Sequence, residues 1–129
     1  DLPNLKYIYD FIGKLSLEEY FALSYLSLSY IGMDTLNMHI AAVQNKQIFA
    51  IFGPTNLRMW SPWSNDQKMA ANENLPVQKY GKITIFQSSM PCVACGKAGC
   101  DDSNQRSECL YTIDPSKIFA QIKKSFINA

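Results

Sequence analysis

Several features that would place the chain in a special class are missing from its sequence. Charge is nearly balanced, with 12 Lys and Arg against 11 Asp and Glu and a net charge of +1, so no nucleic-acid partner is expected. No apolar run approaches the roughly 20 residues that span a bilayer. No basic segment followed by an apolar stretch predicts a signal peptide. The chain starts with Asp1 rather than Met, and we expect it to be a piece of a longer protein.

The rest of the composition is that of a folded domain. The chain has 129 residues, 47% of them hydrophobic and 18% charged, which fits a single domain with one core over residues 1–129. Short strand-like runs alternate with helical segments in the first half. This β-α-β-α-β order with short connections predicts an α/β fold with a Rossmann-like parallel sheet and flanking helices. The predicted strands are residues 5–12, 28–33 and 48–52.

A helix is predicted directly after the first of these strands. Ser16 and Glu19 have the spacing of a capping box, which starts a helix. The side chains that follow at helical spacing share one face of that helix; they are Leu17, Tyr20, Phe21, Ser24, Tyr25 and Leu28.

The second half of the chain is less regular. Residues 82–87 predict another strand, and Asp114-Pro115 opens a last helix over residues 114–127, with Asp114 as its N-cap. Residues 56–80 predict an irregular loop that contains Trp60 and Trp63. We expect these tryptophans to pin the loop to the domain; stacking on a base or sugar is the alternative.

Residues 31–42 predict an anion-binding turn. The end of a buried strand runs into Asp34-Thr35, and a helix that buries Met38 follows. The first backbone N–H groups of a helix lack partners inside it, and the helix dipole makes that end attractive to anions. The only histidine of the chain, His39, lies one helical turn after Thr35 and points toward the same end. A phosphorylated ligand is therefore predicted, although Asp34 and Thr35 are good N-caps whatever the function.

A second wall for this site is predicted at Gly53-Pro54-Thr55. These residues follow the continuous apolar run 48–52, which is typical of a parallel strand covered on both faces. Ligands of doubly wound sheets bind at the carboxyl ends of the strands. Pro54 and Thr55 are therefore expected to line one crevice with Asp34-Thr35, with ordinary turn chemistry as the alternative for Thr55.

Cysteine is absent outside residues 92–109. Two thiolates at C-x-x-C spacing can bind one metal, and two later ones can complete a tetrahedral structural zinc site; the four cysteines are Cys92, Cys95, Cys100 and Cys109. Disulfides and reduced thiols in a loop over residues 90–110 are the alternatives.

Together these segments resemble the C-terminal part of the ADP-heptose:lipopolysaccharide heptosyltransferases, glycosyltransferase family 9. The family shows a Ser-Leu-Glu-Glu-like helix start, then Asp-Ser/Thr-Gly-Pro-x-His-x-Ala-Ala, Phe-Gly-Pro-Thr, a Trp-x-Pro loop and often a cysteine-containing segment. The matching pieces occur in that order over nearly the whole chain, at residues 16–19, 34–42, 52–55, 60–62, 92–109 and 114–115. The resemblance implies a bacterial enzyme with the GT-B architecture, of which this chain would be part of the C-terminal, donor-binding domain.

The resemblance also implies roles for the residues of the turn. Thr35 and the amides of Leu36 and Asn37 would contact the diphosphate of a nucleotide sugar, Asp34 would orient the turn or a sugar hydroxyl, and His39 would reach the diphosphate or sugar. The acceptor hydroxyl would displace the nucleotide diphosphate with inversion, without a catalytic cofactor. The catalytic base would come from the absent N-terminal domain, so this fragment alone is expected to be inactive.

One departure from the family pattern bears on the donor. The family has Gly-Pro where this chain has Leu36-Asn37, and glycine is the residue that lets a diphosphate approach the backbone closely. The alternatives to a donor-binding part are a degenerate transferase domain and a four-cysteine zinc-binding interaction module. We expect an ADP-heptose-like donor, a lipid-linked glycan acceptor bound by the absent domain, and a cytoplasmic protein, with a peripheral position at the inner membrane as the alternative.

Overall fold

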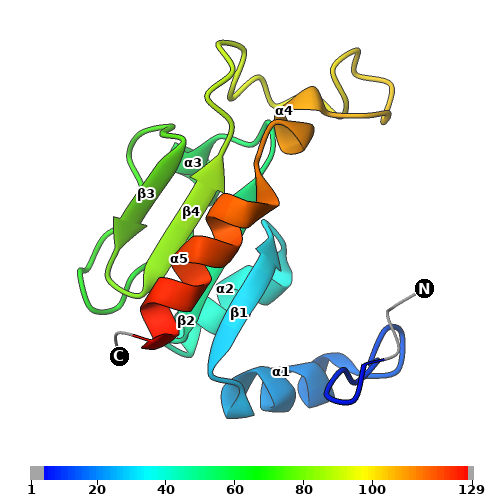
Figure 1. Cartoon of the computed structure of the whole chain (residues 1–129), viewed down its shortest axis with the longest axis vertical. Coiled ribbons are helices and arrows are strands. Elements are labelled where there is room, and N and C mark those ends of the chain that lie inside the picture. Colours follow the sequence, from blue (N-terminus) through cyan, green and yellow to red (C-terminus); the bar gives the residue numbers. More distant parts are fainter. Residues whose placement is uncertain (1–4, 128–129) are drawn as a thin grey trace.

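The computed structural model describes residues 5–127, and Figure 1 shows their arrangement. In chain order the elements are α1 (Leu17–Leu26), β1 (Ser29–Met33), α2 (Leu36–Val43), β2 (Gln47–Phe52), α3 (Leu57–Trp60), β3 (Val77–Tyr80), β4 (Ile83–Gln87), α4 (Glu108–Tyr111) and α5 (Pro115–Ile127). Within this part of the chain, no helix is both long and apolar enough to cross a bilayer.

A four-stranded sheet in the order β1-β2-β4-β3 forms the centre of the fold. β1, β2 and β4 are parallel, and Met33 lies opposite Ile51, so β1 and β2 end together at one edge of the sheet. The predicted parallel α/β fold is thereby confirmed. β3 was not predicted; it pairs antiparallel with β4 through a tight turn in which Gly81 has a φ of 56°, a backbone conformation that glycine adopts without steric cost.

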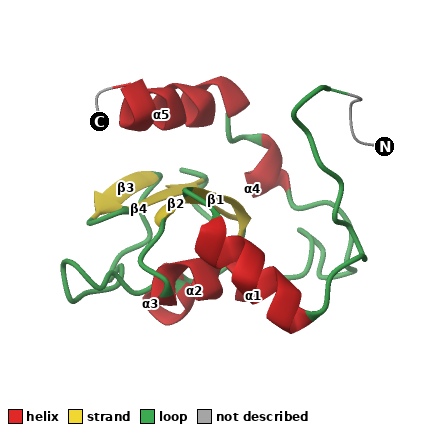
Figure 2. Cartoon of the chain, turned by 90° about the horizontal axis from the view of Figure 1, so that it is seen from below, coloured by secondary structure: helices red, strands yellow, loops and turns green. Residues whose placement is uncertain are grey.

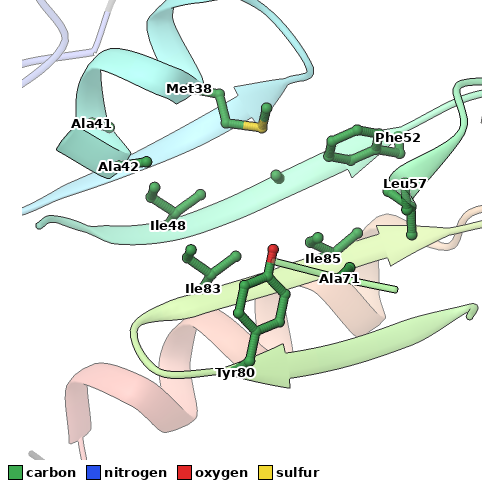
Figure 3. Packing of buried hydrophobic residues seen from close by; sticks show 11 residues of the cluster. Met38, Ala41, Ala42, Ile48, Phe52, Leu57, Ala71, Tyr80, Ile83 and Ile85 are labelled. Atoms are coloured by element: carbon green, nitrogen blue, oxygen red, sulfur yellow. The ribbon is translucent and has the colours of Figure 1, made fainter. Parts of the chain in front are cut away.

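Helices cover both faces of the sheet. Figure 2 shows α5 on one face and α1, α2 and α3 on the other. On the α5 side, the ring centroids of Phe49 and Phe126 lie 6.3 Å apart. On the other side, Met38 of α2 is fully buried in the cluster that Figure 3 shows, as the sequence predicts; this cluster also contains Ala41, Ala42, Ile48, Phe52, Leu57, Ala71, Tyr80, Ile83 and Ile85.

The prediction of a strand over residues 5–12 is wrong. These residues form turns and irregular backbone, and the Asp10 carboxylate accepts a hydrogen bond of 2.9 Å from the Ile12 N–H. A strand needs a hydrogen-bonded neighbour, and within the described residues β1 pairs only with β2. The edge of β1 is accordingly open, and Ile31 is 52% exposed on it.

The capping box that starts α1 is confirmed. The Glu19 N–H donates to the Ser16 hydroxyl at 3.2 Å, and the Ser16 N–H donates to the Glu19 carboxylate at 2.7 Å. The apolar face predicted for this helix is largely exposed, because among its members only Ser24 is buried, while Leu17 and Tyr25 are exposed. The helix itself was therefore predicted correctly, but most of its predicted face is exposed, and Leu28, a predicted member of that face, lies beyond the end of α1.

The last helix is also confirmed. The Asp114 carboxylate accepts a 2.9 Å hydrogen bond from the Ser116 N–H, which is the cap that the sequence predicts. The segment 90–110 is not a loop throughout, because the short helix α4 begins within it at Glu108. The Trp60 and Trp63 side chains are about half exposed, whereas Pro62 between them is buried.

Candidate functional site

The β1–α2 turn is a strand-turn-helix junction of the kind that the sequence predicts. Thr35 is the N-cap of α2, with extended backbone at φ −133° and ψ 172°, but its side chain makes no capping hydrogen bond. Within residues 5–127, the N–H groups of Leu36 and Asn37 find no hydrogen-bond acceptor. These two N–H groups and the dipole of an eight-residue helix make this end of α2 electropositive.

The other residues of the turn and of the start of α2 differ in their solvent exposure. Asp34, Asn37 and His39 are half-buried, whereas Leu36, the first residue of α2, is 60% exposed. The His39 ring makes no hydrogen bond within the described part of the chain. The imidazole is therefore not part of the buried core, and no hydrogen bond within these residues fixes its orientation.

Tyr30 of β1 supports the turn and was missed by sequence reasoning. Its hydroxyl donates to the Met33 carbonyl oxygen at 2.7 Å and lies 3.3 Å from the Thr35 hydroxyl oxygen. The phenol ring passes over Gly32, where an added Cβ would lie 2.6 Å from the Tyr30 hydroxyl oxygen. A tyrosine two residues before a glycine, directly ahead of an Asp-Thr turn, was the signal that could have identified it.

The second predicted wall, Gly53-Pro54-Thr55, follows the carboxyl end of β2 and so lies at the same edge of the sheet as the end of β1. The Gln87 side-chain amide, at the end of β4, donates to the carbonyl oxygens of Gly53 at 3.2 Å and Thr55 at 2.9 Å. Pro54 and Thr55 are half-buried. Sequence reasoning placed Gln87 in a strand but did not identify it as the residue that holds this turn.

A cavity of about 590 Å³ adjoins the β1–α2 turn. It is open to solvent. Asn37 contributes to its wall from α2, Leu15 and Ser16 contribute from the start of α1, and Tyr9 and Phe11 contribute from the N-terminal segment. Burial, followed by the nearby Tyr30, raises the pKa of Tyr20, another lining residue. Sequence reasoning missed this cavity because it predicted the N-terminal segment to be a strand.

The four cysteines come together in the structure. All four line one cavity of about 20 Å³, to which Pro54 also contributes. Each is a free thiol, and only Cys109 is buried. Burial, followed by the neighbouring Cys100 and Cys95, raises the pKa of the Cys109 thiol. In their present arrangement, no three His, Cys, Asp or Glu side chains within residues 5–127 could hold a metal ion.

The cysteine segment lies against the second wall of the site. The Gly96 N–H donates to the Pro54 carbonyl oxygen at 2.9 Å. An added Cβ at Gly53 would lie 3.2 Å from the Leu110 side chain of α4. The turn after β2 is therefore supported by Gln87 and by the cysteine segment with α4.

The parallel sheet and the electropositive turn at its carboxyl edge define a Rossmann-like α/β domain, consistent with part of a GT-B glycosyltransferase. The model of glycosyltransferase family 9, the heptosyltransferases, matches residues 2–89. The chain belongs to this family.

Relatives with curated names are similar to shorter stretches of the chain. Lipopolysaccharide heptosyltransferase 3 of Escherichia coli is 39% identical over 54 residues, which are 42% of this chain and 16% of that protein. Lipooligosaccharide heptosyltransferase 2 of one Campylobacter jejuni strain is 27% identical over 95 residues, which are 74% of this chain. The protein of the same name from a second strain is 26% identical over 100 residues, which are 78% of this chain. The matched part is 25% or 26% of the Campylobacter proteins, so the chain spans about a quarter or less of these relatives. No solved structure gives a significant match.

Proposed function

We propose that this chain is the donor-binding part of a glycosyltransferase that transfers a heptose or a related sugar from a nucleotide-diphospho sugar to a lipopolysaccharide or other glycan. The observation that carries the proposal is the unpaired N-terminus of α2 in a family 9 chain, next to a cavity of about 590 Å³. Asn37 belongs to both features, because its N–H lies in the open helix end and the residue also lines the cavity.

The diphosphate of the donor would bind at the turn. Its oxygens would accept hydrogen bonds from the N–H groups of Leu36 and Asn37 and from the Thr35 hydroxyl, and His39 would add a further donor. Asp34 would orient the turn or accept a bond from a sugar hydroxyl, and Pro54 and Thr55 would close the other side. These donors are fixed before the ligand arrives, so they can stabilise the charge on the departing nucleotide diphosphate without reorganising.

The neighbouring cavity would hold the nucleoside. Its volume lies within the range of small-molecule sites, about 300–1,000 Å³, and its aromatic and apolar side chains suit the faces of a base. We propose that the glycan acceptor and the catalytic base belong to another part of the protein, that the reaction inverts the anomeric centre, and that the fragment alone is inactive. A cytoplasmic enzyme with an ADP-heptose-like donor is the form of this proposal that we favour.

Leu36 supports a second candidate, a degenerate transferase domain that has lost its donor. Its exposed side chain stands at the first position of α2, and in this second candidate its bulk would keep a diphosphate from the backbone. The two candidates differ in whether a nucleotide diphosphate binds at all.

Titration of the full-length protein with ADP- and UDP-sugars by calorimetry separates the two candidates. We expect saturable binding that Thr35→Ala weakens about tenfold or more, because a hydrogen bond to a charged group contributes about 1.5–3 kcal/mol. His39→Ala should weaken it as well, while Tyr25→Phe on the exposed face of α1 should not. Absence of binding for every nucleotide sugar, with the protein folded, would refute the donor site.

A further inference from the structure

Tyr30 makes two hydrogen-bond contacts at the β1–α2 turn through its hydroxyl. Its ring is half-buried in β1, and its hydroxyl bonds both the Met33 carbonyl and the Thr35 hydroxyl, at 2.7 and 3.3 Å. The ring can lie there only because Gly32 has no side chain, since an added Cβ would lie 2.6 Å from the Tyr30 hydroxyl oxygen. Tyr30 and Gly32 together therefore place the Tyr30 hydroxyl beside Thr35.

Counting protons shows which way the second bond runs. A tyrosine hydroxyl has one proton, and the contact with the Met33 carbonyl uses it, because a carbonyl oxygen can only accept. Thr35 must therefore donate to Tyr30 in the second contact. The Thr35 hydroxyl is consequently turned toward β1 rather than toward the first turn of its own helix.

This orientation is unusual for a threonine at an N-cap. Such a side chain ordinarily accepts a hydrogen bond from the second or third N–H of the helix. The Thr35 backbone already has the extended N-cap conformation, yet its side chain makes no capping bond. The backbone is thus already in the conformation of a capping residue, while the hydroxyl contacts Tyr30 instead of the helix N–H groups.

We propose that Tyr30 is a positioning residue for the donor site, which acts by holding the Thr35 hydroxyl away from the helix N–H groups so that they remain free for the diphosphate. The inference rests on the proposed function. When the Thr35 hydroxyl donates to a phosphate oxygen, Tyr30 can turn its own proton from Met33 to the Thr35 oxygen. The pair thereby keeps the turn open without a ligand and supports Thr35 when the ligand is bound.

Tyr30→Phe in the full-length protein tests this role, with ADP and UDP titrated separately as probes. The variant keeps the ring and removes the hydroxyl, so Thr35 is expected to rotate and cap α2. Affinity for the probe that binds should fall about fivefold, the equivalent of one neutral hydrogen bond. The matched control is Tyr25→Phe, since the Tyr25 side chain is 64% exposed and its hydroxyl bonds nothing within residues 5–127; its affinity should stay that of the wild type.

Two further measurements separate positioning from a general structural role. In a Thr35→Ala background, Tyr30→Phe should cause no further loss of affinity, because the residue it acts through is gone. Hydrogen exchange over residues 35–40, measured by mass spectrometry without ligand, should become slower in Tyr30→Phe, since a new cap protects the first turn of α2. A variant that only loosens the fold would exchange faster there.

The outcomes distinguish this inference from the proposed function. If the wild type binds ADP or UDP and Thr35→Ala weakens binding, but Tyr30→Phe does not, the positioning role is refuted and the donor site stands. Additive losses in the double variant, or faster exchange in Tyr30→Phe, also refute it. If the wild type binds neither probe, the donor site fails and the positioning role fails with it.

Discussion

Gln87 offers a test of how the second wall of the site is held. Its side chain is 4% exposed, and its amide nitrogen donates to the carbonyl oxygens of Gly53 and Thr55 at 3.2 and 2.9 Å. These bonds tie the end of β4 to the turn after β2. Gln87→Met removes both donors while keeping a flexible apolar stem of similar length.

The expected cost of this substitution follows from the burial of the two acceptors. Gly53 is buried and Thr55 is half-buried, and a buried group left without its partner costs about 1–3 kcal/mol. The Gln87 side-chain oxygen is itself buried without a partner, so its removal returns about 1 kcal/mol. We expect the free energy of unfolding to fall by about 2 kcal/mol, and nucleotide affinity to fall because the turn at Pro54 loosens.

Chemical denaturation followed by fluorescence measures the first effect, and calorimetric titration with the nucleotide that binds measures the second. Gln78→Met is the matched control, because the Gln78 amide makes a single bond, to the Glu73 carbonyl at 3.1 Å, on the partly exposed edge strand β3. It should cost less than about 0.5 kcal/mol. Equal effects of the two substitutions, or no effect of Gln87→Met on unfolding, would show that Gln87 does not hold the turn.

Three other changes have defined outcomes. Leu36→Gly should raise nucleotide affinity about fivefold, the equivalent of one added backbone hydrogen bond, and calorimetry showing no gain would mean that the side chain does not obstruct the diphosphate. Metal analysis of the protein purified without oxygen should give one zinc per chain that the Cys100→Ser and Cys109→Ser variants lose; a zinc-free wild type would refute the four-thiolate site. Burial raises the pKa of Tyr80 from 10.0 to about 12, so the unfolded chain loses this proton first and stability should fall as the pH rises from about 10 to 12. Denaturation at a series of pH values tests this, and Tyr80→Phe should flatten the decline.

The parts of the fold that the sequence predicted are those fixed by local chemistry. Three predictions that depend on only a few neighbouring residues are confirmed: the capping box at Ser16, the Asp114 cap and the strand over the apolar run 48–52. The prediction of a strand over residues 5–12 failed because β propensity shows only that a segment suits a sheet. It does not show that another strand is present to pair with it. β3 was missed for the related reason that its short polar sequence becomes a strand through pairing with β4.

The candidate site also has a part that short-range sequence patterns predict and a part that they do not. Its predicted anion-binding turn lies in one continuous segment, residues 31–42, so strand-turn-helix patterning was sufficient to predict the junction that the structure has there. The residues that hold its walls act through hydrogen bonds that sequence periodicity does not predict. Tyr30 contacts Thr35, five residues ahead, and Gln87 bonds the turn after β2, more than 30 residues back. The cavity beside the turn depends on how an irregular N-terminal segment packs on α1, which propensity does not determine.

The two walls are therefore fixed by different means, and this bears on how the site can change. The first wall depends on contacts among Tyr30, Gly32 and Thr35, three positions within six residues, so the proposed positioning role implies that a single substitution there would close the helix end. The second depends on β4 and the cysteine segment, which hold Gly53-Pro54-Thr55 by backbone carbonyls rather than by the identity of the wall residues. Because these bonds use main-chain oxygens, we expect substitutions at Pro54 and Thr55 to leave them in place. Under the proposed function, Leu36, exposed at the first position of α2, is the residue whose bulk would most directly affect the bound diphosphate.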